Sequence, residues 1–427
     1  MVLCTVIYNA SSGSDTAASG SNAPTTAHTD TTLSQTVSTA TSTTQTFSGT
    51  IDLTGVANDG TDVIWINTAS GQRHLFRITS FTGGVSTCTA VVTATAAGGT
   101  AGGLSWAIGG IRKTLINDTA RRDLADALSG WRLEFQAGTY ASGSASLSLG
   151  TATNETDGPI EMVAASGASP AFTWTSDSWW LLLSANNIHT IFRGLTITNT
   201  TSTNTGAHGI YLNSQAASLI QDCTIACSGY AIYARTGQGL IQGCDLKSTH
   251  AAALQIETTG YTALRCIVHD SVVGITAGGV ADNTQTNQII GCVVRDNTTG
   301  IDVTTFGYNR TVVIMNSVIE ANGDGVKVTG TVTVTARSQM RVVNNIFTNN
   351  TGYGLNFVTS QLEYRFVHFN NAYYNNTSGA RNNLAAGDND VTLTADPYTA
   401  VGSDDYTLND TAGGGAACKD VGYGYNG

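Results

Sequence analysis

Four cysteines occupy the same position of a short phrase that returns at nearly equal intervals along the chain. Each follows an aliphatic residue two or three positions earlier and precedes a leucine or β-branched residue two positions later. The four are Cys223, Cys244, Cys266 and Cys292, at spacings of 21, 22 and 26 residues. Leu195 fills this position upstream, and Ser317 and Asn345 fill it downstream. A unit this short cannot bury a hydrophobic face alone, so the recurrence predicts repeats that stack on one another.

Each unit contains a second phrase, roughly eight to twelve residues after the first. It begins with a small residue and continues with alternating aliphatic residues, as in Gly300-Ile-Asp-Val303 and Gly325-Val-Lys-Val328. Both phrases have the two-residue period of β-strands, and turn-forming residues separate them without room for a helix. The pattern of leucine-rich repeats is absent. Short strands in turns of about 25 residues therefore predict a parallel β-helix.

The recurring position is expected to face the inside of this solenoid. Alternation places it on the same face as the aliphatic residue two positions later. Buried thiols pack as small hydrophobic groups. Cys223 and Cys227 have the spacing of a metal-ligand pair, but no second pair or histidine accompanies them. We therefore predict a core ladder with no metal site and no cofactor. Its members are Leu195, Cys223, Cys244, Cys266, Cys292, Ser317 and Asn345.

The rest of the chain divides around this solenoid. Residues 1–104 alternate like strands between turn signals, which predicts a small antiparallel β module with an anchoring or assembly role. Residues 105–130 form a linker, in which Asn117–Gly130 has the capping residues and apolar spacing of a helix. We expect this helix to cap the first repeat, although its basic residues could instead dock an acidic partner. The solenoid spans residues 131–383, and residues 384–427 form a C-terminal cap.

Composition excludes two kinds of partner. Only 11% of the residues are charged and the net charge is −11, so nucleic-acid binding is not expected. No apolar run reaches the 18 residues of a membrane span. The first residues also lack the basic and apolar regions of a secretory signal. These features favour a virion protein assembled in the host cytoplasm and released by lysis. An extracellular or cell-surface protein with its signal removed is the alternative.

Three stretches resemble a known family. They are Trp106–Gly110 with the helix that follows, Glu134–Tyr140, and Asp396-Pro397 with Asp405–Leu408. With the repeats, they make the chain similar to the right-handed parallel β-helix repeat proteins, most of all to uncharacterised bacteriophage virion proteins that serve as spikes, fibres or decorations. The resemblance implies the fold and not an activity, because pectin-type lyases, tailspike depolymerases, adhesins and inert fibres share it.

An enzyme of this fold that acts on polysaccharides would need paired carboxylates on its outer face. Four residues after the recurring position, Asp270 and Asp296 are expected to stack one repeat apart, with His269 adjacent. They are the catalytic candidates for a polysaccharide hydrolase or lyase. Asn349 and Asn375 follow at the same position, where an amide serves a turn as well as a carboxylate does. A role in turns is therefore favoured over catalysis.

The residue directly after the recurring position should point outward, yet it is aliphatic in four consecutive repeats. These residues are Ile267, Val293, Val318 and Ile346. A continuous exposed apolar stripe indicates a contact surface. We expect it to form a subunit interface, with a homotrimer favoured, although a loop of the same chain could cover it.

The sequence thus favours a non-enzymatic phage structural protein: a spike, fibre or capsid decoration whose N-terminal module binds other virion proteins. A tailspike that binds or depolymerises a host glycan is the first alternative, using Asp270, Asp296 and aromatic residues such as Tyr233. A bacterial surface adhesin or sheath subunit is the second.

Overall fold

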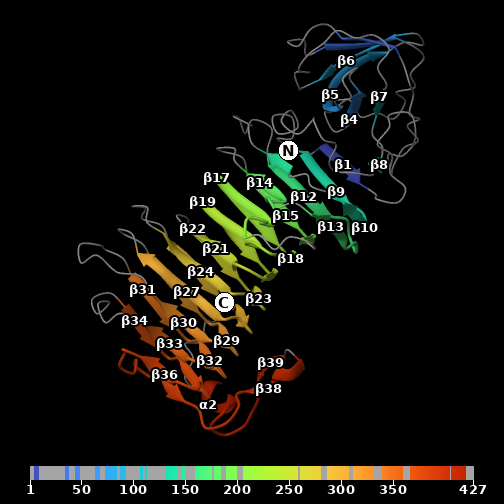
Figure 1. Ribbon diagram of the computed structural model, residues 1–427. Coiled ribbons are helices and arrows are strands. Elements are labelled where there is room, and N and C mark those ends of the chain that lie inside the picture. The colour runs from blue at the N-terminus through green and yellow to red at the C-terminus, as the bar shows by residue number, and fades with distance from the viewer. Residues whose placement is uncertain are drawn as a thin grey trace. The chain divides into compact units, whose positions relative to one another are not determined.

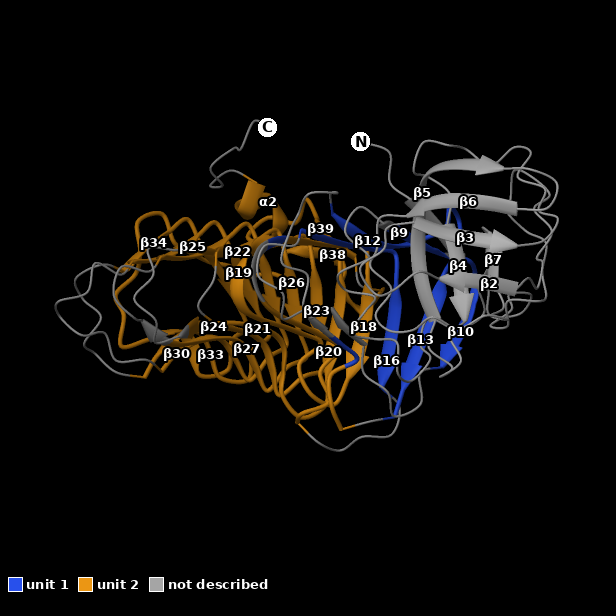
Figure 2. Ribbon diagram, turned by 90° about the horizontal axis from the view of Figure 1, so that it is seen from above, with its two compact units in different colours: residues 1–176, 180–200, 214–217 blue, residues 177–179, 201–213, 218–427 orange. Residues whose placement is uncertain are grey.

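The described part of the chain consists mostly of β-strands joined by turns (Figure 1). The computed structural model describes residues 4–8, 34–37, 44–48, 63–67, 73–83, 87–92, 106–108, 111–112, 131–141, 147–149, 159–175, 177–183, 189–199, 205–257, 260–279, 286–306, 311–329, 339–358, 366–403 and 405–419. Two compact units result (Figure 2). The first comprises residues 1–176, 180–200 and 214–217, and the second comprises residues 177–179, 201–213 and 218–427.

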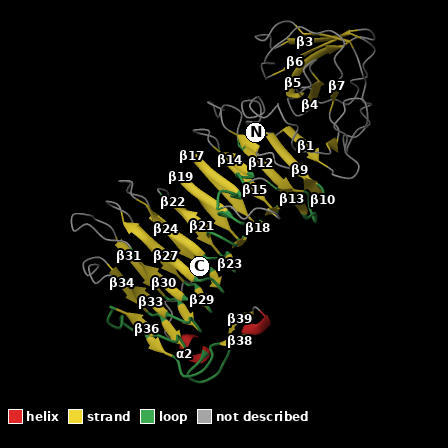
Figure 3. Cartoon of the chain, in the orientation of Figure 1, coloured by secondary structure: helices red, strands yellow, loops and turns green. Residues whose placement is uncertain are grey.

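Helix is confined to the C-terminal segment of the described residues (Figure 3). It consists of the 3-10 turn η2 (Val401–Ser403) and the short helix α2 (Gly415–Lys419). No helix in the described part of the chain has the length and hydrophobicity to cross a membrane. The predicted helix at Asn117–Gly130 lies outside the described residues.

The first unit begins with an antiparallel sheet, as the turn signals predicted. Its strand order is β2-β3-β6-β5-β4-β7. The strands are β2 (Ser34–Val37), β3 (Thr44–Ser48), β4 (Val63–Asn67), β5 (Arg73–Gly83), β6 (Thr87–Val92) and β7 (Trp106–Ile108). The first strand, β1 (Cys4–Tyr8), does not join this sheet. It pairs in parallel with β8 (Ile111–Arg112) and β9 (Trp131–Phe135), at the start of the solenoid.

The solenoid strands of the first unit are parallel and pack around aromatic side chains. They are β10 (Gly138–Ala141), β11 (Leu147–Leu149), β12 (Ile160–Ala164), β13 (Pro170–Trp174), β14 (Leu181–Leu183), β15 (Thr190–Arg193) and β16 (Thr196–Asn199). Phe135 contacts Phe172 edge to face with ring centroids 4.8 Å apart. Trp174, Trp180 and Leu195 are fully buried as well. These large rings fill the interior where the repeats are least regular.

The second unit is a more regular parallel solenoid, in which each strand pairs with its equivalent in the next repeat. One face carries short strands: β18 (Thr224–Cys227), β20 (Asp245–Ser248), β23 (Ile267–His269), β26 (Val293–Arg295), β29 (Val318–Glu320), β32 (Ile346–Thr348), β35 (Ala372–Tyr374) and β37 (Val391–Thr392). The remaining strands form the other walls. They are β17 (Ile210–Gln221), β19 (Ile232–Gln242), β21 (Ala252–Ile256), β22 (Gly260–Leu264), β24 (Val273–Gly279), β25 (Thr286–Ile290), β27 (Thr299–Phe306), β28 (Thr311–Met315), β30 (Asp324–Val328), β31 (Gln339–Val343), β33 (Tyr353–Phe357), β34 (Phe366–Phe369) and β36 (Gly379–Asn382).

Residues with left-handed backbone conformation form the corners at which the short strands begin and end. The residue before the recurring position has a positive φ in repeat after repeat, as at Asn316 (54°), Asn344 (58°) and Asn370 (56°). From β23 onward a second such corner follows the strand, as at Ala321 (53°) and Asn349 (54°). Glycine, asparagine and aspartate tolerate this conformation best. The turn residues of the sequence therefore mark the corners of each repeat.

The recurring position lies inside the solenoid. Cys223, Cys244, Cys266, Cys292, Ser317 and Asn345 are each about 1% exposed. The thiols are free, and those of Cys244, Cys266 and Cys292 each lie within hydrogen-bonding distance of a carbonyl oxygen of the preceding repeat. Cys266 Sγ, for example, lies 3.4 Å from Ile241 O.

From Cys292 onward the ladder is hydrogen-bonded from repeat to repeat. The backbone N–H of Ser317 donates to Asn345 Oδ1 (3.0 Å), and that of Asn345 donates to Asn371 Oδ1 (3.1 Å). The ladder ends at Asp390, whose Oδ1 accepts from the backbone N–H of Asn371 (2.9 Å).

A second internal ladder follows the short strands on their other side. Its members are Ser248, Ser271, Asn297, Asn322, Asn350 and Asn376. The backbone N–H of Asn297 donates to Asn322 Oδ1 (3.1 Å), and that of Asn322 donates to Asn350 Oδ1 (3.0 Å). Both ladders satisfy backbone groups that bends would leave unpaired inside the protein.

The C-terminal segment folds back onto the face of short strands. Its hairpin of β38 (Tyr398–Ala400) and β39 (Asp405–Leu408) is antiparallel. The hydroxyl of Tyr398 lies 3.4 Å from Thr348 Oγ1, and that of Tyr406 lies 3.5 Å from the Glu320 carboxylate. The segment thus covers a side of the solenoid in addition to following its last repeat.

Candidate functional site

The catalytic candidates Asp270 and Asp296 lie at equivalent corners of successive repeats, as their spacing predicted. His269 pairs with Arg295 in the sheet, and the two aspartates follow directly. Both have left-handed backbone, with φ of 49° and 55°. This conformation explains why aspartate and asparagine are the commonest residues at the position. The turn role weighed against catalysis therefore has a direct structural basis.

Each of these carboxylates also contacts a cationic side chain. Asp270 Oδ2 accepts from Lys247 Nζ at 2.8 Å, and this bond holds the pKa of Asp270 below its usual value. Asp296 Oδ2 accepts from Arg295 at 2.6 Å. A general acid at neutral pH needs a pKa raised toward 7. The contacts of Asp270 lower its pKa instead, so they do not suit it to act as a general acid.

His269 completes this charged row. Its Nε2 lies 2.8 Å from Asp245 Oδ1 and its Nδ1 lies 3.0 Å from Asp270 Oδ2. The hydrogen bond to Asp245 raises the pKa of His269, and the bond to Asp270 adds to this effect. A histidine placed between two carboxylates is stabilised as a cation, which makes it a poor general base. Sequence reasoning noticed His269 but missed Asp245 and Lys247, which the register of β20 and β23 brings beside it.

Glu320 is a buried carboxylate that sequence reasoning also missed. It is paired in register with Arg295, and burial raises its pKa. Asn349 Nδ2 lies 3.4 Å from its Oε1, and Tyr406 of the C-terminal segment lies against its Oε2. Glu320 therefore lies beneath the segment that folds back, where a polymer could not reach it without displacing that segment.

The described residues contain no group of three or more histidine, cysteine, aspartate or glutamate side chains that could hold a metal ion. Cys227, which has the spacing of a metal ligand from Cys223, is buried, and burial raises the pKa of its thiol to about 12. A thiol with so high a pKa is neutral at physiological pH and chemically inert.

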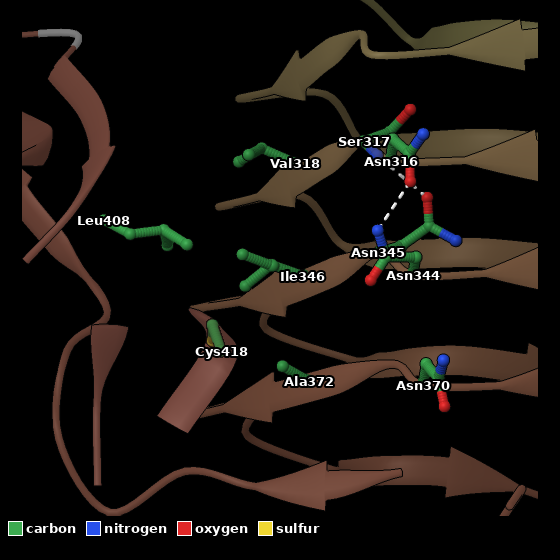
Figure 4. Close-up of a pocket in the computed structure, with 10 residues that line it drawn as sticks. All are labelled: Asn316, Ser317, Val318, Asn344, Asn345, Ile346, Asn370, Ala372, Leu408 and Cys418. Atoms are coloured by element: carbon green, nitrogen blue, oxygen red, sulfur yellow. Dashed lines mark hydrogen bonds between the residues drawn. The ribbon is translucent and has the colours of Figure 1, made fainter. Parts of the chain in front are cut away.

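The aliphatic stripe has the predicted register but not a uniform environment. Ile267, Val293, Val318 and Ile346 are successive partners in the sheet. Ile267 is 40% exposed. Val318 and Ile346 instead face Leu408 and Cys418 across a cavity of about 200 Å³ (Figure 4). A segment of the same chain therefore covers the second half of the stripe, whereas in the first half Ile267 is exposed and Val293 is half-buried.

Polar side chains line the other wall of this cavity. Asn316, Asn344 and Asn370 come from successive corners, and Asn344 Nδ2 donates to Asn316 Oδ1 at 2.6 Å (Figure 4). Ala372 continues the stripe and is buried. The cavity thus belongs to the packing of the C-terminal segment on the solenoid.

Five aromatic rings gather on the second unit at its first repeats. We call Trp179, His208, Tyr211, Tyr230 and Tyr233 the aromatic cluster. Tyr211 and Tyr233 stack with ring centroids 4.7 Å apart at 7°. All five side chains are half-buried. The sequence-based prediction named Tyr233 alone. Tyr211 occupies the equivalent position of the preceding repeat, so it could have been predicted in the same way.

A comparison with protein-family models identifies the repeats. The model described as "Right handed beta helix region" matches residues 181–312 and 208–377. A search of curated proteins finds no significant match. The match agrees with the observed parallel solenoid, and its description is that of a right-handed coil.

The solved structures that resemble this chain are distant from it. Pectate lyase Pel9A has 14% identity and a TM-score of 0.43, over 66% of this chain and 77% of that one. ORF18 of Geobacillus virus E2 has 15% identity and a TM-score of 0.42, over 61% of this chain and 52% of that one, so this chain spans about half the viral protein's length. The catalytic domain of a GH87 α-1,3-glucanase has 13% identity and a TM-score of 0.35, over 84% and 87%. At these identities and TM-scores, the three similarities support no conclusion about this chain.

Proposed function

We propose that this chain is a non-enzymatic structural component of a virus particle, a spike, fibre or capsid decoration in which the β-helix is the rigid exposed body. The observation that carries the proposal is the continuous hydrogen bonding of the interior. Two polar ladders join successive repeats through side-chain amides, and one of them is anchored at Asp390. A solenoid joined internally in this way resists bending, which suits a mechanical role.

The charged row supports a structural role over a catalytic one. Asp270 and Asp296 are the carboxylates that come closest to a catalytic pair, and both serve as corner residues that contact bases. Lys247 and His269 hold Asp270, and Arg295 holds Asp296. The outer face is therefore a stable polar surface.

Partners follow from the same proposal. The antiparallel sheet of the first unit would bind other virion proteins. The open half of the stripe, Ile267 with Val293, would contact further copies of this chain, with a trimer about the solenoid axis as the favoured arrangement. The protein would be assembled in the host cytoplasm and released by lysis.

Particles of the virus that encodes the chain provide the test. An antibody against residues 205–257 should label intact particles in negative-stain electron microscopy, and proteomics of purified particles should detect the chain. The purified protein should release no reducing sugar from capsular polysaccharide of the host. Finding the chain only in a bacterial surface fraction would support an adhesin or sheath subunit and contradict the proposal. Release of reducing sugar would instead establish a depolymerase.

The aromatic cluster favours a second candidate, a spike that also binds a host glycan. Rings that are not needed in the core are gathered on the outside of the solenoid near Arg235 and Glu257. Such a role is compatible with a structural one and is independent of whether the chain degrades its ligand.

A further inference from the structure

The aromatic cluster lies outside a core that is already complete. Tyr211 and Tyr233 alternate with inward-facing residues of β17 and β19, all fully buried. These inward-facing residues are Ile210, Leu212, Ile232 and Ala234. Packing of the interior therefore does not require aromatic rings on the other side of the strands. One repeat later the equivalent outward residue of Tyr233 is Gln255, and the next is Thr276. The rings are thus a local feature of these repeats.

Backbone close packing fixes part of the cluster. The backbone N–H of Tyr230 donates to His208 Nδ1 at 3.2 Å, and the rings of these two residues stack at 4.9 Å. A side chain on Gly229 would collide with the same imidazole, at 2.7 Å from Nδ1. Burial lowers the pKa of His208 to about 4. The imidazole is therefore neutral at physiological pH, and Nε2 carries its proton.

Paired polar groups border the rings. The hydroxyl of Tyr233 donates to Glu257 Oε1 at 2.6 Å, and Arg235 NH1 donates to the hydroxyl of Tyr211 at 3.0 Å. Arg235 Nε lies 3.9 Å from Glu257 Oε2, so the two charges neutralise each other. Half of the Arg235 side chain (52%) is exposed. The border thus offers planar donors and acceptors without net charge.

These features select a class of ligand. A pyranose ring has an apolar face of C–H groups that packs against aromatic rings, and vicinal hydroxyls that a guanidinium or carboxylate can bind in pairs. A nucleic acid could also stack on the rings, but its phosphates would need unpaired cations, and Arg235 faces Glu257. A charged sugar would gain nothing from the neutralised pair. Uncharged saccharides fit best.

We propose that the aromatic cluster is a binding site for a neutral saccharide, with the apolar face of a pyranose ring against the cluster and its hydroxyls bonded to Arg235 and Glu257. This proposal rests on the second candidate function and names its ligand class, and it is independent of the structural role because neither the ladders nor the open stripe includes residues of the cluster. It requires binding only and no bond cleavage.

An array of neutral and uronic-acid-containing oligosaccharides, probed with the full-length protein, tests this site. We expect binding to neutral members, followed by calorimetric titration of the strongest one. Tyr211→Ala and Tyr233→Ala should each weaken that binding at least about 10-fold, as expected from the loss of one stacking contact. Tyr233→Phe, which keeps the ring, should stay within about threefold of the native affinity.

The control is Tyr374→Ala, a half-buried tyrosine of β35 outside the cluster, which should bind like the native protein. Circular dichroism and the unfolding midpoint show whether each variant is folded. Native affinity in folded Tyr211→Ala and Tyr233→Ala would overturn the proposal. Binding to acidic members alone, or to no member of the array, would overturn it as well. None of these results would affect detection of the chain in virus particles.

Discussion

A single interior position accepts cysteine and asparagine because both supply a donor to the equivalent carbonyl of the preceding repeat, whereas the hydroxyl of Ser317 donates to Met315 O of its own repeat. The thiol of Cys244 lies 3.6 Å from Ile220 O, and the amide of Asn345 donates to Ile314 O at 3.0 Å. Each acceptor lies three residues before the recurring position of the preceding repeat. Asparagine forms more hydrogen bonds at this position than cysteine does, because its side-chain oxygen also accepts a backbone N–H. The ladder therefore has fewer hydrogen bonds between repeats at its cysteines than at its asparagines, which lie toward the C-terminus.

Asn345→Ala should destabilise the protein markedly. The change leaves the N–H of Ser317 and the carbonyl of Ile314 without partners inside the solenoid. Buried groups left unpaired each cost about 1–3 kcal/mol, so the free energy of unfolding should fall by roughly 2–4 kcal/mol in urea titrations. Asn382→Ala, which removes one bond to Asn356 on the outside, should cost about 0.5 kcal/mol or less. Equal losses in the two variants would contradict the role assigned to the ladder.

The inward placement of the recurring position followed from alternation alone, because a two-residue period determines which side of a strand a residue occupies. The partners of Asp270 could not be read in the same way. Lys247 reaches it from the preceding repeat, across a corner whose length varies along the chain. The aromatic cluster was missed for a related reason, since His208 and Tyr230 lie in turns, where periodicity gives no register.

At the scale of the strand and its corners, the backbone conformation explains which residue types recur. Most left-handed corners carry asparagine, aspartate or glycine, whereas Arg265 and Ala321 depart from this rule, each with φ of 53°. An alanine in this region is strained by roughly 1–2 kcal/mol, because its Cβ approaches the carbonyl oxygen. The repeat tolerates the strain because the sheet bonds on both sides fix the corner.

Ala321→Gly should therefore stabilise the protein, which is unusual for a glycine substitution. Relief of the strain exceeds the entropy that glycine gains in the unfolded chain, so we expect the free energy of unfolding to rise by about 0.5–1 kcal/mol. Ala226→Gly, in the middle of β18, is the matched control and should lower it by about 0.5–1 kcal/mol. A loss of stability at Ala321 similar to that at Ala226 would show that the corner is not strained.

The last ladder element depends on a buried carboxylate, which makes the C-terminal end sensitive to acid. The Asp390 side chain is 1% exposed and lies 3.1 Å from Arg381 NH1 and 3.2 Å from His368 Nδ1. Burial by itself would raise the pKa of Asp390, but His368 and the backbone amides of Asn371 and Gly387 hold the pKa below its usual value. The folded state therefore favours the ionised form.

Asp390→Asn should lower the free energy of unfolding at pH 7 by about 2–4 kcal/mol, since it leaves Arg381 without its counter-charge. In the native protein the stability due to Asp390 is present above the unfolded-state pKa of about 4 and is lost as the pH falls through the lower folded-state value. Urea titrations between pH 7 and pH 3 should show a shallower acid dependence in the variant. Asp410→Asn, at a fully exposed ion pair, should leave both quantities unchanged. An identical acid slope in Asp390→Asn would contradict this account.

At the scale of the whole molecule, the C-terminal segment determines how much of the aliphatic stripe is available to another copy. Val318 and Ile346 already face Leu408 and Cys418, whereas Ile267 is exposed. The two halves of one continuous row therefore have different roles. The covered half holds the chain's own cap, and the open half is the part that subunit assembly could use.

The double variant Ile267→Asp with Val293→Asp should dissociate the oligomer, because two carboxylates would enter an apolar contact between subunits. Light scattering coupled to size exclusion would report a monomer, with far-UV circular dichroism like that of the native protein. Val318→Asp is the matched control from the covered half of the stripe. It should lower the unfolding midpoint by burying a charge beneath the cap, while the remaining folded protein keeps its oligomeric state. A folded double variant with unchanged mass would exclude the stripe as the subunit interface, and loss of assembly in Val318→Asp alone would show that the cap opens to let the covered half take part.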